Sequence, residues 1–171
     1  MSRPAETEYA PFYSGYVSLV PESDVLAVLE EQRDVFRRLA VAVSAGRERH
    51  RYAEGKWSIR EVAGHLVDAE RVFGYRAFAF SRGAKAPLPS FDENEYVAES
   101  GYDEVPLAEL VDELVAVRDA NLEVLRRLAD AQWARVGTAS GKPVSVRALA
   151  FIMAGHPRHH LAILRERYGV A

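Results

Sequence analysis

The sequence contains no cysteine among its 171 residues. Disulfide bonds and thiolate metal ligands are therefore excluded, and any metal ion would have to be held by nitrogen and oxygen atoms. The sequence also lacks a run of about 18 consecutive apolar residues, which is what a membrane-spanning helix requires. Its polar opening, MSRPAETEY, does not resemble a secretion signal. We therefore predict a soluble, cytoplasmic protein without a membrane partner.

An excess of charge of one sign is also missing. The formal net charge is −3, and acidic and basic residues alternate along the chain. Nucleic acid is not expected as a partner, because phosphate backbones are bound by concentrated basic faces. A content of 49% hydrophobic and 27% charged residues is typical of a folded domain and not of a disordered tail. The length suits one domain with a substantial core, so we predict a single domain over residues 1–171.

Prolines and aromatic residues are concentrated in the first 21 residues. Pro4, Pro11 and Pro21 discourage a helix. The aromatic side chains between them could dock this segment onto the body of the protein or onto a partner subunit. We predict an extended arm over residues 1–21.

Beyond the arm, apolar residues recur at steps of three and four in four stretches, which is typical of amphipathic helices. No stretch of any length alternates with the period of two that a strand requires. The helical stretches lie at about residues 22–43, 58–83, 106–130 and 145–168. Four such helices predict an all-α fold, a four-helix bundle with long connections.

Two of the connections are long. The segment 84–105 is too long for a tight helical hairpin, so it could carry the chain across the end of the bundle. The helices that it joins would then not need to be antiparallel neighbours. A cover over a functional site and a disordered loop are equally compatible with its composition. The loop 131–144 leaves room for a short extended pair within residues 135–145.

Two histidines lie on the apolar face of the last predicted helix. His156 and His160 are four residues apart, which places their Cβ atoms about 5–6 Å apart on one face. Both imidazoles could then bind one metal ion at about 2.0–2.1 Å. His65 borders the apolar face of the second helix and is the best third ligand, because His50 lies in a basic stretch that is expected to be exposed. Three imidazoles with an open position favour a catalytic zinc or nickel site, with iron or copper as alternatives.

The histidine pair alone is a weak signal, since most such pairs lie at helix surfaces or hydrogen-bond within a core. Their place on the apolar face favours a metal, because buried imidazoles need partners. Pro157 lies between the two ligands and should bend the helix. The bend could aim His156 at the ion, or it could spoil the geometry. His159 is expected to face a neighbouring helix or solvent, and it could support a ligand as a hydrogen-bond donor.

Other polar residues lie near the predicted core. Asp68, one turn after His65, and Gln32 could orient a ligand imidazole or a substrate. Alternatively, Asp68 is solvated or paired with Arg71, while Gln32 or Asn121 forms hydrogen bonds across the core.

The stretch from Lys56 to Arg71, KWSIREVAGHLVDAER, resembles the second helix of the DinB-like superfamily of metalloenzymes. The segments 87–97 and 154–168 are similar to the linker and the last helix of that family. The resemblance implies a four-helix bundle, usually dimeric, that binds a divalent metal through one histidine of the second helix and an H-x-x-x-H motif in the last. The corresponding residues here are His65, His156 and His160. Pro157 stands where an acidic residue commonly follows the first histidine of the last motif.

The resemblance also implies a reaction. The metal would activate a low-molecular-weight thiol, such as bacillithiol or mycothiol, for transfer or isomerisation, or it would activate water for hydrolysis. We therefore predict a metal-dependent enzyme that acts on a small molecule and forms a homodimer. The alternative is a non-catalytic, metal-binding, stress-related dimer.

Overall fold

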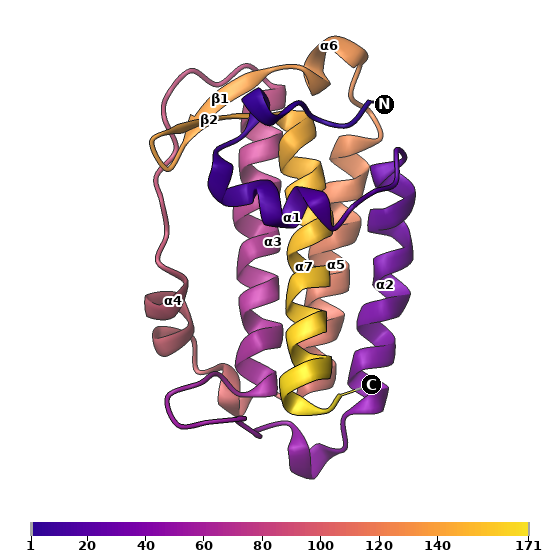
Figure 1. The fold of residues 1–171 in the computed structure, drawn as a ribbon, viewed down its shortest axis with the longest axis vertical. Helices are drawn as coiled ribbons and strands as arrows, with labels where there is room; N and C mark the ends of the chain where they lie inside the picture. The colour runs from indigo at the N-terminus through magenta and orange to yellow at the C-terminus, as the bar shows by residue number, and fades with distance from the viewer. Residues whose placement is uncertain (1, 171) are drawn as a thin grey trace.

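Four long helices run side by side in the computed structural model, which describes residues 2–170 (Figure 1). Their bounds lie within a few residues of the predicted stretches, and the predicted all-α four-helix bundle is confirmed. The helices are α2 (Val25–Ala42), α3 (Ile59–Ser81), α5 (Leu107–Leu125) and α7 (Val146–Tyr168).

Side-chain caps fix where the two histidine-bearing helices begin. At the start of α3, the Ser58 hydroxyl accepts from the Glu61 amide at 3.1 Å, and the Ser58 amide donates to the Glu61 carboxylate at 2.7 Å. This reciprocal pair satisfies two amides that the first turn would otherwise leave unpaired. At the start of α7, the Ser145 hydroxyl accepts from the Ala148 amide at 3.0 Å. The caps set the register that points the histidines inward.

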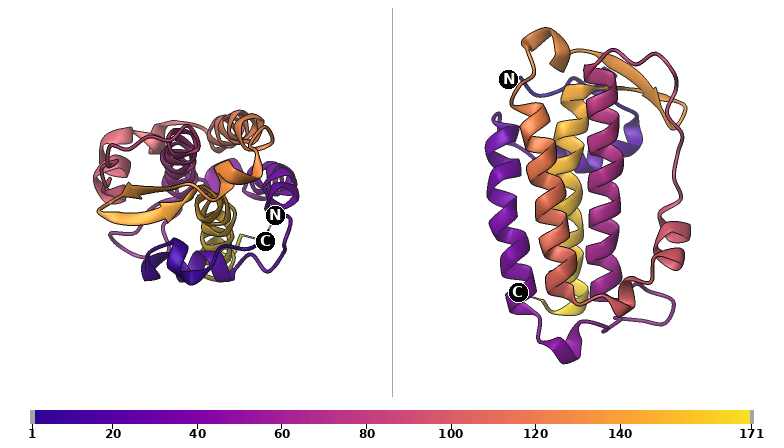
Figure 2. Two further views of the ribbon diagram at one scale, coloured as in Figure 1. Left: turned by 90° about the horizontal axis from the view of Figure 1, so that it is seen from above. Right: turned by 180° about the vertical axis from the view of Figure 1, so that it is seen from behind.

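The order of the helices around the bundle differs from their order in the sequence. α3 packs against α5 and α7, and α2 packs against the same two helices. The end-on view in Figure 2 shows α2 and α3 at diagonal corners. α3 and α5 run in the same direction, because the long linker returns the chain to the other end of the bundle (Figure 1). The sequence-based expectation that these two helices need not be antiparallel is confirmed.

The long linker contains a helix that the sequence analysis did not predict. α4 (Glu93–Ser100) begins at Asp92, whose carboxylate accepts from the amides of Asn94 at 2.9 Å and Glu95 at 3.2 Å. Gly101 ends it with a φ of 68°, a conformation that glycine adopts without strain. A 3-10 turn, η4 (Tyr102–Glu104), follows. Of the two alternatives for residues 84–105, the disordered loop is therefore wrong over residues 93–104.

A small hairpin covers one end of the bundle. After the short helix α6 (Asp130–Trp133), β1 (Val136–Ala139) pairs antiparallel with β2 (Lys142–Ser145), so the short extended pair is confirmed. Leu88 of the linker joins this hairpin: its amide donates to the Thr138 carbonyl at 2.8 Å, and its carbonyl accepts from the Ser140 amide at 3.1 Å. The hairpin therefore anchors the beginning of the long linker.

The N-terminal arm lies outside the four helices, but it is not extended as predicted. It contains the 3-10 turns η1 (Glu6–Glu8) and η2 (Pro11–Tyr13) and the short helix α1 (Ser14–Ser18). Pro11 stands at the first position of its turn, where a missing amide costs nothing. α1 packs across α7 at Gly155, where a Cβ atom would lie 1.9 Å from the Tyr16 carbonyl oxygen.

A polar layer divides the core. One apolar cluster fills the half of the bundle next to the hairpin and the other fills the opposite half. Between them lie Gln32, Glu70 and Arg118, each less than 5% exposed, and the histidines lie at the same level. No helix within the described residues combines the length and the apolar character needed to cross a membrane.

Candidate metal centre

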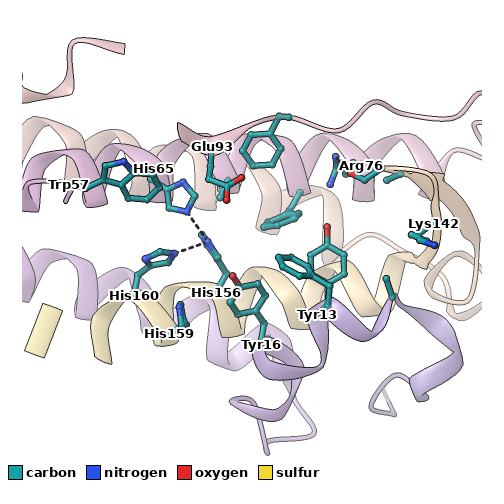
Figure 3. A pocket seen from close by; sticks show the side chains of 17 residues that line it. Tyr13, Tyr16, Trp57, His65, Arg76, Glu93, Lys142, His156, His159 and His160 are labelled. Carbon is teal, nitrogen blue, oxygen red and sulfur yellow. Dashed lines mark hydrogen bonds between the residues drawn. The ribbon is translucent and has the colours of Figure 1, made fainter. Parts of the chain in front are cut away.

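Three imidazoles from two helices converge at one point, as Figure 3 shows. Nε2 of His65 on α3 lies 3.0 Å from Nε2 of His156 on α7, and Nε2 of His160 lies 3.0 Å from the same atom. Each residue offers one ring nitrogen, and these three atoms lie within 4.8 Å of one another. The structure thus brings together the three histidines that the sequence analysis selected, in a group that could hold a metal ion.

The surroundings keep these imidazoles neutral. Burial lowers the pKa of His65 to about 4. Burial, and then the neighbouring His65 and His159, lower the pKa of His160 to about 3. The pKa of His156 is also lowered, chiefly by burial and then by the adjacent histidines. Because an imidazole must be unprotonated to bind a metal, the three rings are in the ligand state at neutral pH.

The set of donor atoms fits a divalent metal. Within residues 2–170, Nδ1 of His65 is the one buried side-chain nitrogen or oxygen that has no hydrogen-bond partner. Such an atom is rare in a folded protein and calls for an explanation, of which a functional role or a nearby ion is one. The three Nε2 atoms face one another, and three uncharged nitrogens at this separation need a shared proton or ion between them. Imidazole nitrogens suit zinc and nickel.

Pro157 does not interrupt α7. The helix continues through it to Tyr168, and His156 and His160 still converge. Pro157 cannot donate to the Met153 carbonyl, but Nη2 of the buried Arg118 donates to that oxygen instead, at 3.2 Å. The next carbonyl, that of Ala154, accepts from Nε2 of Gln32 at 2.6 Å. The concern that the proline spoils the geometry is thereby removed.

A cavity of about 540 Å³ opens beside the three histidines. Aromatic rings form much of its wall: the Trp57 ring lies 4.8 Å from that of His65, and the Tyr16 ring lies 5.2 Å from that of His156. Glu93, the first residue of α4, brings the one carboxylate among the lining residues, and its side chain points toward the histidine end in Figure 3. Burial, and then Glu93, raise the pKa of Tyr16, so its phenol stays protonated. The cavity has the size of a small-molecule site.

The remaining histidines and polar candidates do not belong to the group of three ligand atoms. His50 is exposed, as predicted, and His159 is exposed at the rim of the cavity with its ring 5.5 Å from that of Tyr16. Asp68 is half-buried and accepts from the Tyr102 hydroxyl at 2.7 Å. Arg71 pairs with Glu113, so the suggested pairing of Asp68 with Arg71 is wrong. Gln32 and Asn121 follow the alternative reading, because both form hydrogen bonds across the core to Arg118 or Glu70.

Sequence reasoning missed several residues of the site. Glu93 was assigned to an acidic tract. Asp92 with Glu95 three residues later is typical of a helix start, and Gly101 is typical of a helix end. Arg76 lines the cavity and lies 11 residues after His65, a spacing of about three turns that places the two residues on the same face of the helix. This spacing was a usable signal. Tyr16 is one of the aromatic residues that were expected to dock the arm, but its place beside His156 depends on the packing of the arm on α7, which is a tertiary contact.

The fold and the site together define a class: four-helix-bundle proteins with a candidate three-histidine metal centre beside a cavity. The sequence agrees with this class. The model of the DinB superfamily matches residues 28–164, and the chain belongs to this family. A search of curated proteins gives no match.

Solved structures share the fold. YfiT from Bacillus subtilis, described as a probable metal-dependent hydrolase with an unusual four-helix bundle topology, is 19% identical with a TM-score of 0.75, covering 99% of this chain and 94% of that one. A DinB-like protein of the same organism, YjoA, is 21% identical with a TM-score of 0.58, over 83% and 87% of the two chains. A mycothiol-dependent maleylpyruvate isomerase is 16% identical with a TM-score of 0.65, over 86% of this chain and 60% of the isomerase.

Proposed function

We propose that this chain is a divalent-metal-dependent enzyme that acts on a small molecule. His65, His156 and His160 hold the metal, zinc or nickel, and a low-molecular-weight thiol or water is activated for S-transfer or hydrolysis. The observation that carries the proposal is the convergence of three buried or half-buried neutral imidazoles at one end of a cavity of about 540 Å³. A structural metal would not need such a cavity beside it.

The chain's own residues are suited to this chemistry. A divalent metal on three imidazoles supplies an open position at which the pKa of a bound water or thiol falls. Glu93 lies on the same side of the cavity and can accept the proton that is released. Trp57 and Tyr16 pack against His65 and His156, where they restrict water to the open side of the cavity. The protonated Tyr16 phenol can donate a hydrogen bond to a substrate.

Two of the structural neighbours support this range of reactions. One is described as a probable metal-dependent hydrolase, and another as a mycothiol-dependent isomerase. Water and a thiol are the two nucleophiles that those descriptions name or imply. The two chemistries differ in the nucleophile and share the need for a metal with an open position.

The alternative is a non-catalytic, metal-binding, stress-related dimer. Its main support was Pro157, which could have marked a decayed site. Because α7 is continuous and Arg118 donates a hydrogen bond to the Met153 carbonyl, Pro157 is no evidence for a decayed site. Homodimerisation remains part of both proposals.

Elemental analysis of the purified protein tests the metal site. We expect about one zinc or nickel per chain in the wild type and less than a tenth of that in His65→Ala and His160→Ala. His50→Ala, in which an exposed histidine outside the site is lost, serves as the control. Failure of the wild type to bind zinc or nickel at micromolar concentration would refute the enzyme proposal. Metal binding without thiol transfer or hydrolysis would favour the alternative.

A further inference from the structure

The end of the cavity away from the histidines holds a buried guanidinium without an acidic partner. The Arg76 side chain belongs to a residue that is only 2% exposed. Its Nη2 donates to the Pro89 carbonyl at 2.7 Å and to the Ser140 hydroxyl at 3.1 Å. No carboxylate of the described residues forms an ion pair with it. The buried and half-buried arginines that do form ion pairs include Arg33, Arg60, Arg118 and Arg147. Arg76 thus carries a buried charge that the protein does not neutralise.

Arg118 shows how this protein treats a buried arginine that serves structure alone. It is 0% exposed, and its Nε and Nη2 donate to the two carboxylate oxygens of Glu70, each at 2.8 Å. Removing a charge from water costs several kcal/mol unless a partner compensates, so this pairing is the expected solution. The absence of such a partner at Arg76 requires a different explanation.

Two nitrogens of Arg76 are free of partners within residues 2–170 and are not sealed from solvent. A guanidinium has five N–H groups, and the two on Nη2 are used by Pro89 and Ser140. Nε and Nη1 have no hydrogen-bond partner among the described residues, and both remain accessible to solvent. Arg76 also lines the cavity. Its unpaired N–H groups can therefore reach a ligand there.

The cavity is polarised along α3. Eleven residues separate His65 from Arg76, which corresponds to three turns and about 16 Å along the helix axis, on the same face. Figure 3 shows Arg76 and Lys142 at one end and the histidines with Glu93 at the other. Between them the wall is apolar and aromatic, with Phe73 in its middle. A ligand that fits this space has an anionic group at one end and an apolar body.

We propose that Arg76, with Ser140 and Lys142 beside it, is an anion subsite that binds the carboxylate of a small aromatic or similarly flat substrate. A carboxylate is favoured over a phosphate because both N–H groups of Nη2 are occupied, which leaves single hydrogen bonds from Nε and from Nη1. So few donors suit an anion with two oxygens better than one with three. The placement of the substrate's reacting end at the histidines rests on the proposed function. The subsite itself does not depend on a metal.

Binding of three matched probes tests the subsite: 3-phenylpropanoate, its uncharged amide 3-phenylpropanamide, and phenyl phosphate. Calorimetric titrations use protein freed of metal by EDTA and dialysis, so a carboxylate cannot bind to a metal instead, and they are repeated with zinc. In the wild type we expect the carboxylate to bind about tenfold more tightly than the amide. Arg76→Gln should bring the two probes within twofold. Arg82→Gln, which removes an exposed arginine just beyond the same helix, should leave the preference unchanged.

Equal binding of the carboxylate and the amide by the wild type would overturn the proposal. Tighter binding of phenyl phosphate than of the carboxylate would overturn the choice of ligand class. If Arg76→Gln does not fold, the wild type still decides: its arginine Nε–H signals, followed by NMR, should include one that shifts with the carboxylate and not with the amide. That signal should be missing in Arg76→Lys. A separate zinc titration reports on the metal centre, so either proposal can fail without the other.

Discussion

Arg118 donates a hydrogen bond to the Met153 carbonyl, the oxygen that Pro157 leaves without its helical partner. The bond joins α5 to α7 one turn before His156, inside the polar layer that divides the core. The same guanidinium is paired with Glu70 of α3. Its Nη1 also donates to the Leu29 carbonyl and to Gln32 of α2, so one buried side chain links all four long helices.

The first prediction concerns the strength of this link. Arg118→Ala leaves the Glu70 carboxylate buried and unpaired, and we expect the free energy of unfolding to fall by about 3–5 kcal/mol. Arg126→Ala is the matched control, because it removes an arginine at the C-terminal end of the same helix that pairs with Glu30 at the surface. Its expected cost is only a small fraction of that of Arg118→Ala, because exposed ion pairs contribute little to stability. Urea denaturation measures both, and equal costs would contradict the structural role.

The second prediction concerns the coupling between Arg118 and Pro157. Pro157→Ala restores an amide that can donate to the Met153 carbonyl, so that oxygen no longer needs Arg118. We expect Arg118→Ala to cost about 0.5–1.5 kcal/mol less in the Pro157→Ala background than in the wild type. A double-mutant cycle from urea denaturation measures this difference. Strict additivity would show that the two residues are independent.

The third prediction concerns Gly64, the residue before His65. A Cβ atom there would lie 2.1 Å from the ring of Tyr102, whose hydroxyl is held by Asp68. We expect Gly64→Ala to lower the free energy of unfolding by about 1–2 kcal/mol, because overpacking outweighs the gain in helix propensity. Gly46→Ala, in the turn η3 (Ala45–Arg47), meets no atom within 4 Å and should change stability by less than about 0.5 kcal/mol. Thermal denaturation compares the two.

The fourth prediction concerns pH and the metal-free protein. The pKa of His65 is about 4 and that of His160 about 3 in the folded state, against 6.5 for an unperturbed histidine. Between these values and 6.5 the unfolded chain binds more protons than the folded chain, so stability falls as the pH is lowered from 6.5 toward 4. The slope should reach up to about 1.4 kcal/mol per pH unit for each histidine that stays neutral. Stability should be flat with respect to these groups above about pH 7.

Urea titrations at pH 7, 6 and 5 check this behaviour on protein treated with EDTA. The variant carrying both His65→Gln and His160→Gln should show a shallower loss between pH 6 and 5, because two of the groups that bind protons only in the unfolded state are absent. An unchanged slope in that variant would assign the acid sensitivity to other groups.

Periodicity in the sequence was enough to predict the bundle and the three converging histidines. His156 and His160 share a face by their spacing, and His65 lies beside an apolar face. The polar layer was not predicted, because Glu70 and Arg118 look like solvent-facing charges until a second helix supplies the partner. Arg76 could have been placed on the face of His65 from its spacing, but its partners Pro89 and Ser140 come from the linker and the hairpin. Glu93 was missed for a local reason, since the cap at Asp92 was not recognised.

The separation of His65 and His156 along the chain has a consequence for the order of events during synthesis. The two residues are 91 positions apart. At a translation rate of roughly 5–20 residues per second, His156 follows His65 after about 5–18 seconds. Until then the nascent chain offers a metal only one imidazole of the three. Under the proposed function, a metal ion that needs all three imidazoles can therefore be bound only after α7 has been made and has packed against α3.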